Sequence, residues 1–268
     1  MESYQWRSSA SGPSNFKTTM PVAKLIQEHL REVETERTTR ALVEGLEAKV
    51  CAIKEFQQRR FRHTYSDLLS SQRHGAACHF FLEELYGPRD FSQRDEQFAK
   101  VVPSLVRLFP KEIVDTVASL AELHALSERL DTEMGRHLVL PRVDAVSYSK
   151  AWRATGQTAQ RARQIDLTLD VARSLDLLTR RPLLRNVLRL MRPPARAAGL
   201  GELQQFLERG FETFRAMRGA QDFVATVERR ERELSTALFG ESLFGESLAE
   251  NAETYKANET ISLLPPLE

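Results

Sequence analysis

One carboxylate of this chain is a candidate for chemistry because its helical position is apolar. Glu84 belongs to the run Phe-Phe-Leu-Glu-Glu-Leu-Tyr-Gly-Pro, residues 80–88. At 100° per residue Glu84 falls beside Phe80 and Phe81, whereas Glu83 falls on a polar stripe. A carboxylate buried there must raise its pKa, bind a cation or accept hydrogen bonds.

We expect Glu84 to be structural, pinning neighbouring helices by accepting hydrogen bonds from an arginine such as Arg73, Arg89 or Arg94. A role as acid, base or ligand is the alternative, and an exposed position is a third. In the structural interpretation the segment packs aromatic side chains into the core and reverses the chain at Gly-Pro. The candidate structural motif comprises Phe80, Phe81, Glu84, Leu85, Tyr86, Gly87, Pro88 and Asp90.

A second candidate group lies on one stripe of a later helix. His124, Glu128 and Asp131 are spaced i, i+4 and i+7, and with Glu84 from another helix they could hold a transition metal. Dinuclear carboxylate bundles use Glu-x-x-His pairs, and this sequence contains none. We therefore expect a packing role and no cofactor. A metal, or a haem held by His124, stays the alternative.

A third candidate is basic. Residues 182–191 form a short amphipathic helix in which arginines share one stripe. Such a helix can bind an anionic membrane surface, an acidic partner or nucleic acid. Because it is short and lacks an interleaved aromatic platform, we expect neither membrane nor nucleic-acid binding. The candidate anion-binding residues are Arg181, Arg185, Arg189 and Arg192.

Composition limits the classes of function. The formal net charge is +1, so the overall charge makes no case for nucleic acid. Charge is nevertheless uneven: residues 151–196 hold ten Arg and three Asp, while the residues after Arg196 are acidic on balance. The two cysteines, Cys51 and Cys78, make no disulfide framework, and no signal core or run of about 20 apolar residues occurs. These features predict a soluble cytoplasmic protein.

The motif residues also resemble a known family. The segment from Tyr65 to about Asp95, together with residues 123–128 and Leu130-Asp131, is similar to the bacterial FFLEELY-motif proteins. The resemblance covers the first half of the chain. It implies a helical fold and supplies no reaction. Loops typical of phosphate or dinucleotide binding, and paired Cys-x-x-Cys or His-Glu-x-x-His motifs, are absent from the sequence.

Apolar residues recur at three-four spacing through most of the chain, and glycines and prolines fall between these segments. The pattern predicts an all-α array of roughly seven or eight mostly antiparallel helices. The polar stretch 34–40 suggests a break or an exposed middle. Ser92 and Asp95 predict a capping box. The expected helices cover about 21–70, 74–86, 92–108, 111–138, 144–179, 182–191, 201–217 and 220–238.

Three regions follow from these elements. Residues 1–20 are Ser/Thr-rich and predict a disordered tail, and residues 21–238 form one helical domain, with a sub-boundary near 139–144 as the alternative. Residues 239–268 predict a flexible acidic tail. A tandem Leu-Phe-Gly-Glu-Ser duplication, residues 238–247, lies at its start.

The absence of a reaction-specific motif favours a non-catalytic protein that acts through protein–protein interaction. We expect the partner to be another protein or a second copy of the chain. A helical enzyme or carrier containing metal or haem is the first alternative. A nucleic-acid-binding protein that uses the basic helix is the second.

Overall fold

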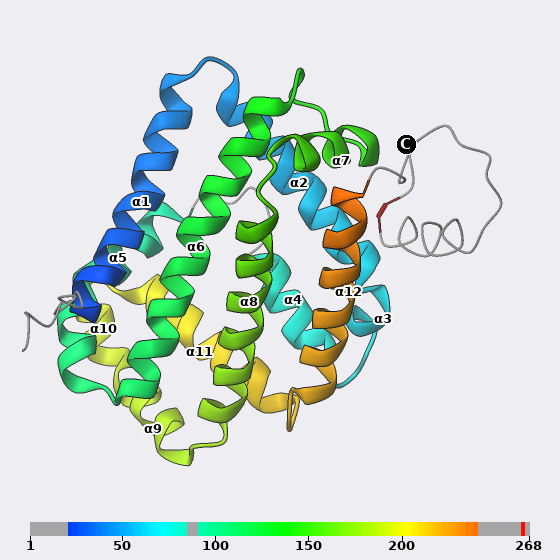
Figure 1. Cartoon of the computed structure of the whole chain (residues 1–268). Helices are drawn as coiled ribbons and strands as arrows, with labels where there is room; N and C mark the ends of the chain where they lie inside the picture. The colour runs from blue at the N-terminus through cyan, green and yellow to red at the C-terminus, as the bar shows by residue number, and fades with distance from the viewer. Residues whose placement is uncertain (1–20, 85–90, 241–263, 266–268) are drawn as a thin grey trace, which may run out of the picture.

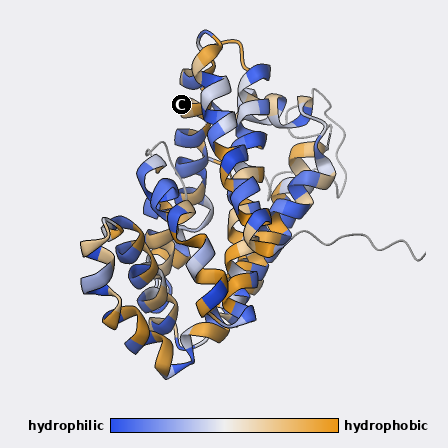
Figure 2. Cartoon of the chain, turned by 90° about the vertical axis from the view of Figure 1, so that its left-hand side faces the viewer, coloured by the Kyte–Doolittle hydropathy of each residue, from blue (hydrophilic) through white to orange (hydrophobic). Residues whose placement is uncertain are grey.

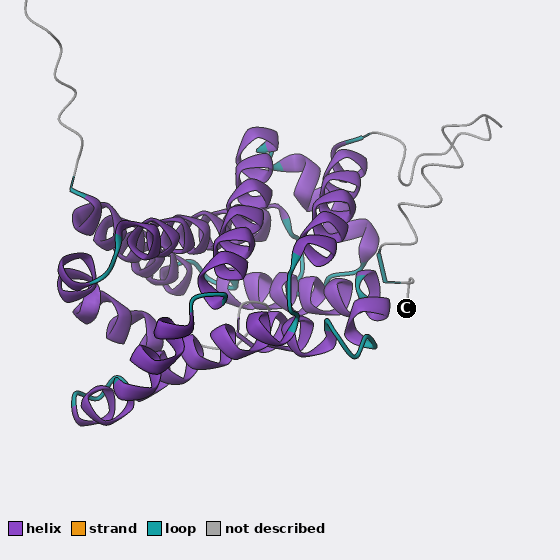
Figure 3. Cartoon of the chain, turned by 90° about the horizontal axis from the view of Figure 1, so that it is seen from below, coloured by secondary structure: helices purple, strands orange, loops and turns teal. Residues whose placement is uncertain are grey.

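The computed structural model describes residues 21–84, 91–240 and 264–265, and its elements are twelve helices with no strand among these residues (Figure 3). The predicted all-α class is confirmed. The helices are α1 (Val22–Leu42), α2 (Leu46–Thr64), α3 (Ser66–Leu69), α4 (Gly75–Glu84), α5 (Ser92–Leu108), α6 (Lys111–His137), α7 (Ala145–Ala154), α8 (Thr158–Thr179), α9 (Pro182–Leu190), α10 (Arg192–Ala197), α11 (Gly201–Ala216) and α12 (Gln221–Phe239).

The described residues contain more helices than the expected seven or eight, and two of the additional ones arise because glycines divide two of the long expected helices. Gly45, with φ of 73°, separates α1 from α2, and Gly156, with φ of 60°, separates α7 from α8. Glycine reaches this left-handed region without the steric cost that a Cβ imposes. The single regular helix expected over 144–179 is therefore two helices.

The consecutive prolines Pro193 and Pro194 begin a helix instead of ending one. They lie in the first turn of α10. The first backbone N–H groups of a helix have no intrahelical acceptor, so a residue without an N–H is tolerated there. The interval 192–200, which we expected to lie between two helices, therefore contains a short helix joined closely to α9.

Helix α5 begins at Ser92 as expected, but not for the expected reason. Its N-cap is Phe91, and no side chain caps the helix. The carboxylate of Asp95 bonds to His124 and Arg37 instead of a backbone N–H. The predicted capping box is wrong because the Asp95 carboxylate bonds to side chains of other helices instead.

Helix α6, the longest, lies at the centre of the array and contacts α1, α2, α5, α7 and α8 (Figure 1). Its pairing with α1 is parallel. Ile26 and Ala121 share one core cluster, and further along both helices Arg40 bonds to Thr132. This pair departs from the mostly antiparallel arrangement that we expected.

The pairing of α6 with α8 is antiparallel. Arg161 near the start of α8 reaches Met134 near the end of α6, and Arg163 pairs with Glu122 further back. Helix α12 then packs against the other side of α8. The three helices form adjacent columns, and Figure 1 shows α6, α8 and α12 in this order.

The core is divided among several clusters, most of which include residues of α6. One cluster joins α2, α6, α7 and α12, and it includes Leu264, which is only 3% exposed. This residue belongs to the segment that we expected to be a flexible tail. The expected tail over 1–20 and most of 239–268 lie outside the described residues. In the described ranges no helix is both long and apolar enough to cross a membrane.

Candidate functional site

A long central cavity runs through the helical array and is the first candidate site. Its volume is about 260 Å³, and every helix except α3, α9 and α10 contributes to its wall. Along α6 the lining extends from Val117 to Asp131, a separation of about 21 Å at the helical rise per residue. A volume this small over such a length makes the cavity narrow.

Glu84 lies on the wall of the central cavity at the end of α4 and is 8% exposed. Arg209 of α11 donates to its carboxylate and also to that of Glu83. Arg94 of α5 donates to the backbone oxygen of Glu84 at 3.0 Å and to its carboxylate at 3.4 Å. Glu84 therefore joins α4 to α5 and α11.

Only one of the three arginines that we expected near Glu84 is observed there. Arg73 instead donates to the backbone oxygens of Met217 and Gly219 at 2.8 Å each. Arg89 lies outside the described residues. The principal partner, Arg209, is 125 positions away, and no signal in the sequence identifies it.

The two phenylalanines of the motif pack against α11. Phe80 stacks on Phe206 with 5.6 Å between ring centroids, and Phe81 meets Phe214 edge-on. Phe80 also lies over Gly210, where a Cβ would come within 3.0 Å of its ring. The other predicted motif residues, Leu85, Tyr86, Gly87, Pro88 and Asp90, lie outside the described residues.

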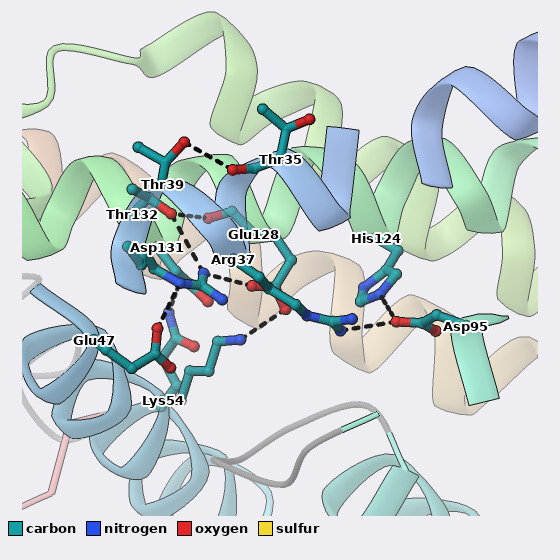
Figure 4. Close-up of polar contacts among 12 residues, drawn as sticks. Thr35, Arg37, Thr39, Glu47, Lys54, Asp95, His124, Glu128, Asp131 and Thr132 are labelled. Carbon is teal, nitrogen blue, oxygen red and sulfur yellow. Dashed lines mark hydrogen bonds and ion pairs between the residues drawn. The ribbon is translucent and has the colours of Figure 1, made fainter. Parts of the chain in front are cut away.

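Asp95 and His124 form a polar group on the cavity wall beside Arg37 (Figure 4). The Asp95 carboxylate lies 2.9 Å from Nε2 of His124 and 2.8 Å from Nη2 of Arg37. Burial opposes the charge of Asp95, but the bonds from His124 and Arg37 outweigh it and lower the pKa of this carboxyl. Asp95 is therefore an ionised anchor between α5, α6 and α1.

Glu128 is buried and binds two cations (Figure 4). Arg40 of α1 donates to it at 2.6 Å, and Lys54 of α2 donates at 2.7 Å. Burial alone would raise the pKa of Glu128, but the charges of Lys54 and Arg40 bring it to about 2. One turn on, Asp131 accepts a 2.8 Å bond from Gln57, and burial raises the pKa of this carboxyl.

Residues 34–40 are not a break. Arg37 and Arg40 follow Ile26, Leu30 and Val33 at three-four spacing, so they face the same side of α1 as the apolar stripe. Arg40 is 3% exposed, and its charge is compensated by Glu128. That continued spacing was a signal in the sequence that our interpretation missed.

The candidate metal ligands are near one cavity but do not form a metal site. Glu84 is bonded to arginines, His124 to Asp95, and Glu128 to Arg40 and Lys54. In the described part of the chain no group of three or more His, Cys, Asp or Glu side chains could hold a metal ion. Each of these carboxylates is oriented by a cation or a neutral donor of the protein, which is the packing role that we expected; metal binding was only the alternative.

Helix α9 leaves part of its apolar surface exposed, while Leu184 and Leu188 are partly buried. Leu183 is 77% and Leu190 75% exposed. On the inward side Arg185 pairs with Glu212 of α11. Figure 2 shows hydrophobic and hydrophilic residues alternating along the helices at the lower end of the molecule. We define the α9 face as the exposed side chains Leu183, Val187, Leu190 and Met191.

The four arginines predicted to bind an anion are divided by this orientation. Arg185 and Arg192 form ion pairs with Glu212 and Glu208 of α11. Arg181 and Arg189 are exposed and form no ion pair with a described residue. The predicted common stripe of four is therefore reduced to two available cations.

A hollow of about 540 Å³ adjoins the beginning of α9. Its charged lining comprises several arginines and one carboxylate, Asp176, which is paired with Arg180. Arg218 stands at the hollow with φ of 53°, a conformation that costs a non-glycine residue energy. The lining arginines are Arg180, Arg181, Arg185, Arg215 and Arg218.

In a comparison with protein families, most of the described helices fall within the match to a single family model. The model of a family described as Domain of unknown function (DUF8198) matches residues 36–243. The chain belongs to this family. The DUF8198 match includes α2 to α12, and thus the motif, α9 and nearly all of the central cavity wall. Neither the curated proteins nor the solved structures contain a match.

Proposed function

We propose that this DUF8198 protein is non-catalytic and acts by binding a partner protein through the α9 face. The observation that carries the proposal is the outward apolar side of α9. Its side chains at positions 183, 187, 190 and 191 follow the i, i+4, i+7, i+8 spacing with which one helix meets another. The expected partner element is an acidic amphipathic helix.

The hydrophobic effect favours covering this face. Fully burying a leucine side chain contributes about 1.5–3 kcal/mol relative to leaving it exposed. Leu183 and Leu190 are largely exposed, and Val187 and Met191 are partly so. Contact of a partner with this small set of residues would supply most of the apolar contribution to binding.

The charge around the α9 face favours an acidic partner. Arg181 and Arg189 flank the apolar residues, and the arginine-lined hollow adjoins the first turn. A second copy of the chain would present the same basic face, and the like charges of the two faces would repel each other. Nucleic acid is disfavoured because leucines, and not aromatic stacking residues, lie between the arginines.

A model peptide tests this function. Its helix carries leucines at i, i+3, i+4 and i+7 with glutamates beside them, and a matched peptide carries lysines instead. Fluorescence anisotropy should show binding of the glutamate peptide only. Leu183→Asp with Leu190→Asp should weaken that binding at least tenfold, since each substitution removes an apolar contact.

The matched control is Val139→Asp with Leu140→Asp, which changes two exposed apolar residues between α6 and α7. It should bind like the parent. Equal binding of both peptides, no binding of either, or undiminished binding by the α9 variant would overturn the proposal. Stronger binding to phosphatidylglycerol vesicles, or a dimer that the α9 substitutions dissociate in sedimentation, would replace the proposed partner by lipid or by a second copy.

We also propose that the chain is a bacterial FFLEELY-motif protein of the cytoplasm. Residues 80–86 spell the motif, and its described residues connect α4 to α5 and α11. Both cysteines are free, and burial raises the pKa of the Cys78 thiol to about 12, which suits a structural thiol in a reducing compartment. Recovery of the native protein from an extracellular fraction would contradict this assignment.

A further inference from the structure

The hollow beside α9 brings together cationic side chains from two separate parts of the chain. It lies where α8 and α11 end and where α9 begins, so its lining comes from within residues 176–186 and 211–219. Five arginines supply all of its cationic groups, and one carboxylate lines it. A hollow lined mainly by charges of one sign attracts ligands of the opposite sign.

The single acid on the wall of the hollow is already occupied. Asp176 is 6% exposed, and one of its carboxylate oxygens accepts a 2.6 Å bond from Arg180. The other oxygen accepts a 3.0 Å bond from the backbone N–H of Ala220. Asp176 therefore connects the end of α8 to the beginning of α12, and its charge is compensated within the protein.

The other four arginines have one carboxylate between them. Glu212 of α11 bonds to Arg185 at 2.7 Å and to Arg215 at 3.5 Å. Arg181 and Arg218 are exposed, and neither forms an ion pair with a described residue. Counting Asp176 and Glu212 against the five arginines leaves an excess of three positive charges.

The helix termini at the hollow remove only part of this excess. The C-terminus of a helix carries roughly half a negative charge, so the ends of α8 and α11 together offset about one arginine. The beginning of α9 contributes roughly half a positive charge. At least about two positive charges therefore remain for a ligand to compensate.

The backbone at Arg218 is a second unusual feature of the hollow. Its φ of 53° lies in the left-handed region, which asparagine or glycine adopts at lower cost than arginine. Residues held in such conformations are concentrated at functional sites. The turn between α11 and α12 thus places a guanidinium at the hollow where a smaller residue would fit the backbone better.

We infer that the hollow beside α9 binds a small molecule that carries a diphosphate group. Guanidinium groups bind phosphate oxygens in bidentate geometry, and a diphosphate supplies several negative charges where a carboxylate supplies one. The volume of about 540 Å³ lies in the range of small-molecule sites, about 300–1,000 Å³, and leaves room for an organic group. No residue of the α9 face lines the hollow, so this inference is independent of the apolar contact proposed above.

Inorganic pyrophosphate, in buffer without divalent cations, is the probe. Calorimetry on the full chain should show binding at least tenfold tighter than that of orthophosphate, which brings fewer charges and acceptors. Citrate tests charge alone, because it has three carboxylates and no phosphate, and it should also bind at least tenfold more weakly. The affinity for pyrophosphate should fall as NaCl is added, since salt screens exposed charges.

A double variant locates the ligand. Arg181→Gln with Arg218→Asn removes the two arginines that have no ion pair, and asparagine tolerates the left-handed backbone, so the variant should fold. Its affinity for pyrophosphate should be at least tenfold weaker. The matched control, Arg142→Gln with Arg229→Gln, removes the same charge at exposed positions that do not line the hollow. The control should bind like the parent.

A further variant separates this inference from the proposed function. Leu183→Ala with Leu190→Ala removes apolar contacts of the α9 face without adding charge, and it should bind pyrophosphate like the parent. Absence of pyrophosphate binding by the parent, or equal binding of citrate, would overturn the inference. So would an unchanged affinity in the Arg181 and Arg218 variant, or an equal loss in its control.

Discussion

At the scale of single residues, the charged groups around the central cavity serve mainly to connect helices. Glu84 joins α4 to α5 and α11, and Asp95 joins α5 to α1 and α6. A buried carboxylate needs such partners because desolvation penalises its charge. The acids that the sequence singled out therefore have partners on other helices, and those partners orient them.

Glu128 gives a pH-dependent prediction. Its pKa in the folded protein, about 2, lies below the ordinary value of 4.5, so its contribution to stability is complete above 4.5 and is lost as the pH falls toward 2. Glu128→Gln should lower the free energy of unfolding by about 3 kcal/mol at pH 7. In urea titrations the difference from the parent should diminish below pH 4.5.

The control for this prediction is Glu133→Gln, which removes a half-buried carboxylate with local ion pairs to Arg136 and His137. Pairs of this kind contribute under about 1 kcal/mol. If the two variants differ from the parent equally at every pH, the buried interaction of Glu128 with Arg40 and Lys54 is not the source of the effect.

At the scale of elements, close packing of α2 on α6 depends on the absence of a side chain. A Cβ on Gly135 of α6 would lie 2.8 Å from Cγ2 of Val50 and 3.0 Å from Cδ1 of Leu46. Both neighbours are buried, and a valine in a helix has little rotamer freedom. The glycine therefore sets the distance between these two helices.

Gly135→Ala should reduce the free energy of unfolding by about 1 kcal/mol. The steric cost of overpacking, about 1–3 kcal/mol, exceeds the gain of up to about 1 kcal/mol in helix propensity. Urea unfolding measures the difference. Gly201→Ala is the control, because no atom lies within 4 Å of its added Cβ. Gly201→Ala should leave the free energy of unfolding unchanged or raise it. An equal rise in both variants would contradict the prediction and show that α2 moves to accommodate the added Cβ.

At the scale of the whole molecule, one residue that follows the last helix by many positions in the sequence packs back into the core. Leu264 belongs to the same cluster as Phe56, Trp152 and Leu238. It lies outside residues 36–243, the part matched by the DUF8198 model. The folded unit of this chain is therefore larger than the region that defines the family.

Leu264→Ala should lower the free energy of unfolding by about 2 kcal/mol, because it removes buried methyl groups from the cluster that supports Trp152. Thermal and urea unfolding test this. Leu183→Ala, at a position 77% exposed, should change stability by less than about 0.5 kcal/mol. If Leu264→Ala unfolds like the parent, Leu264 does not stabilise the core.

The sequence by itself determined the helical class and most helix boundaries. Apolar spacing, Pro182 at the start of α9 and the residues around Pro110 act within one or two turns, so the local chain decides them. The burial of Glu84 also followed from its place among phenylalanines. Two divisions, at Gly45 and Gly156, were not predicted, because a glycine within a helical pattern does not reveal its φ.

Only the tertiary structure decided which groups meet. Arg209 reaches Glu84 across 125 positions, and Arg40 reaches Glu128 across 88. The outward side of α9 was likewise undetermined, since an amphipathic pattern defines two faces without saying which one α11 covers. Partner choice depends on the packing of whole helices around α6, and side-chain spacing within one helix contains no information about that packing.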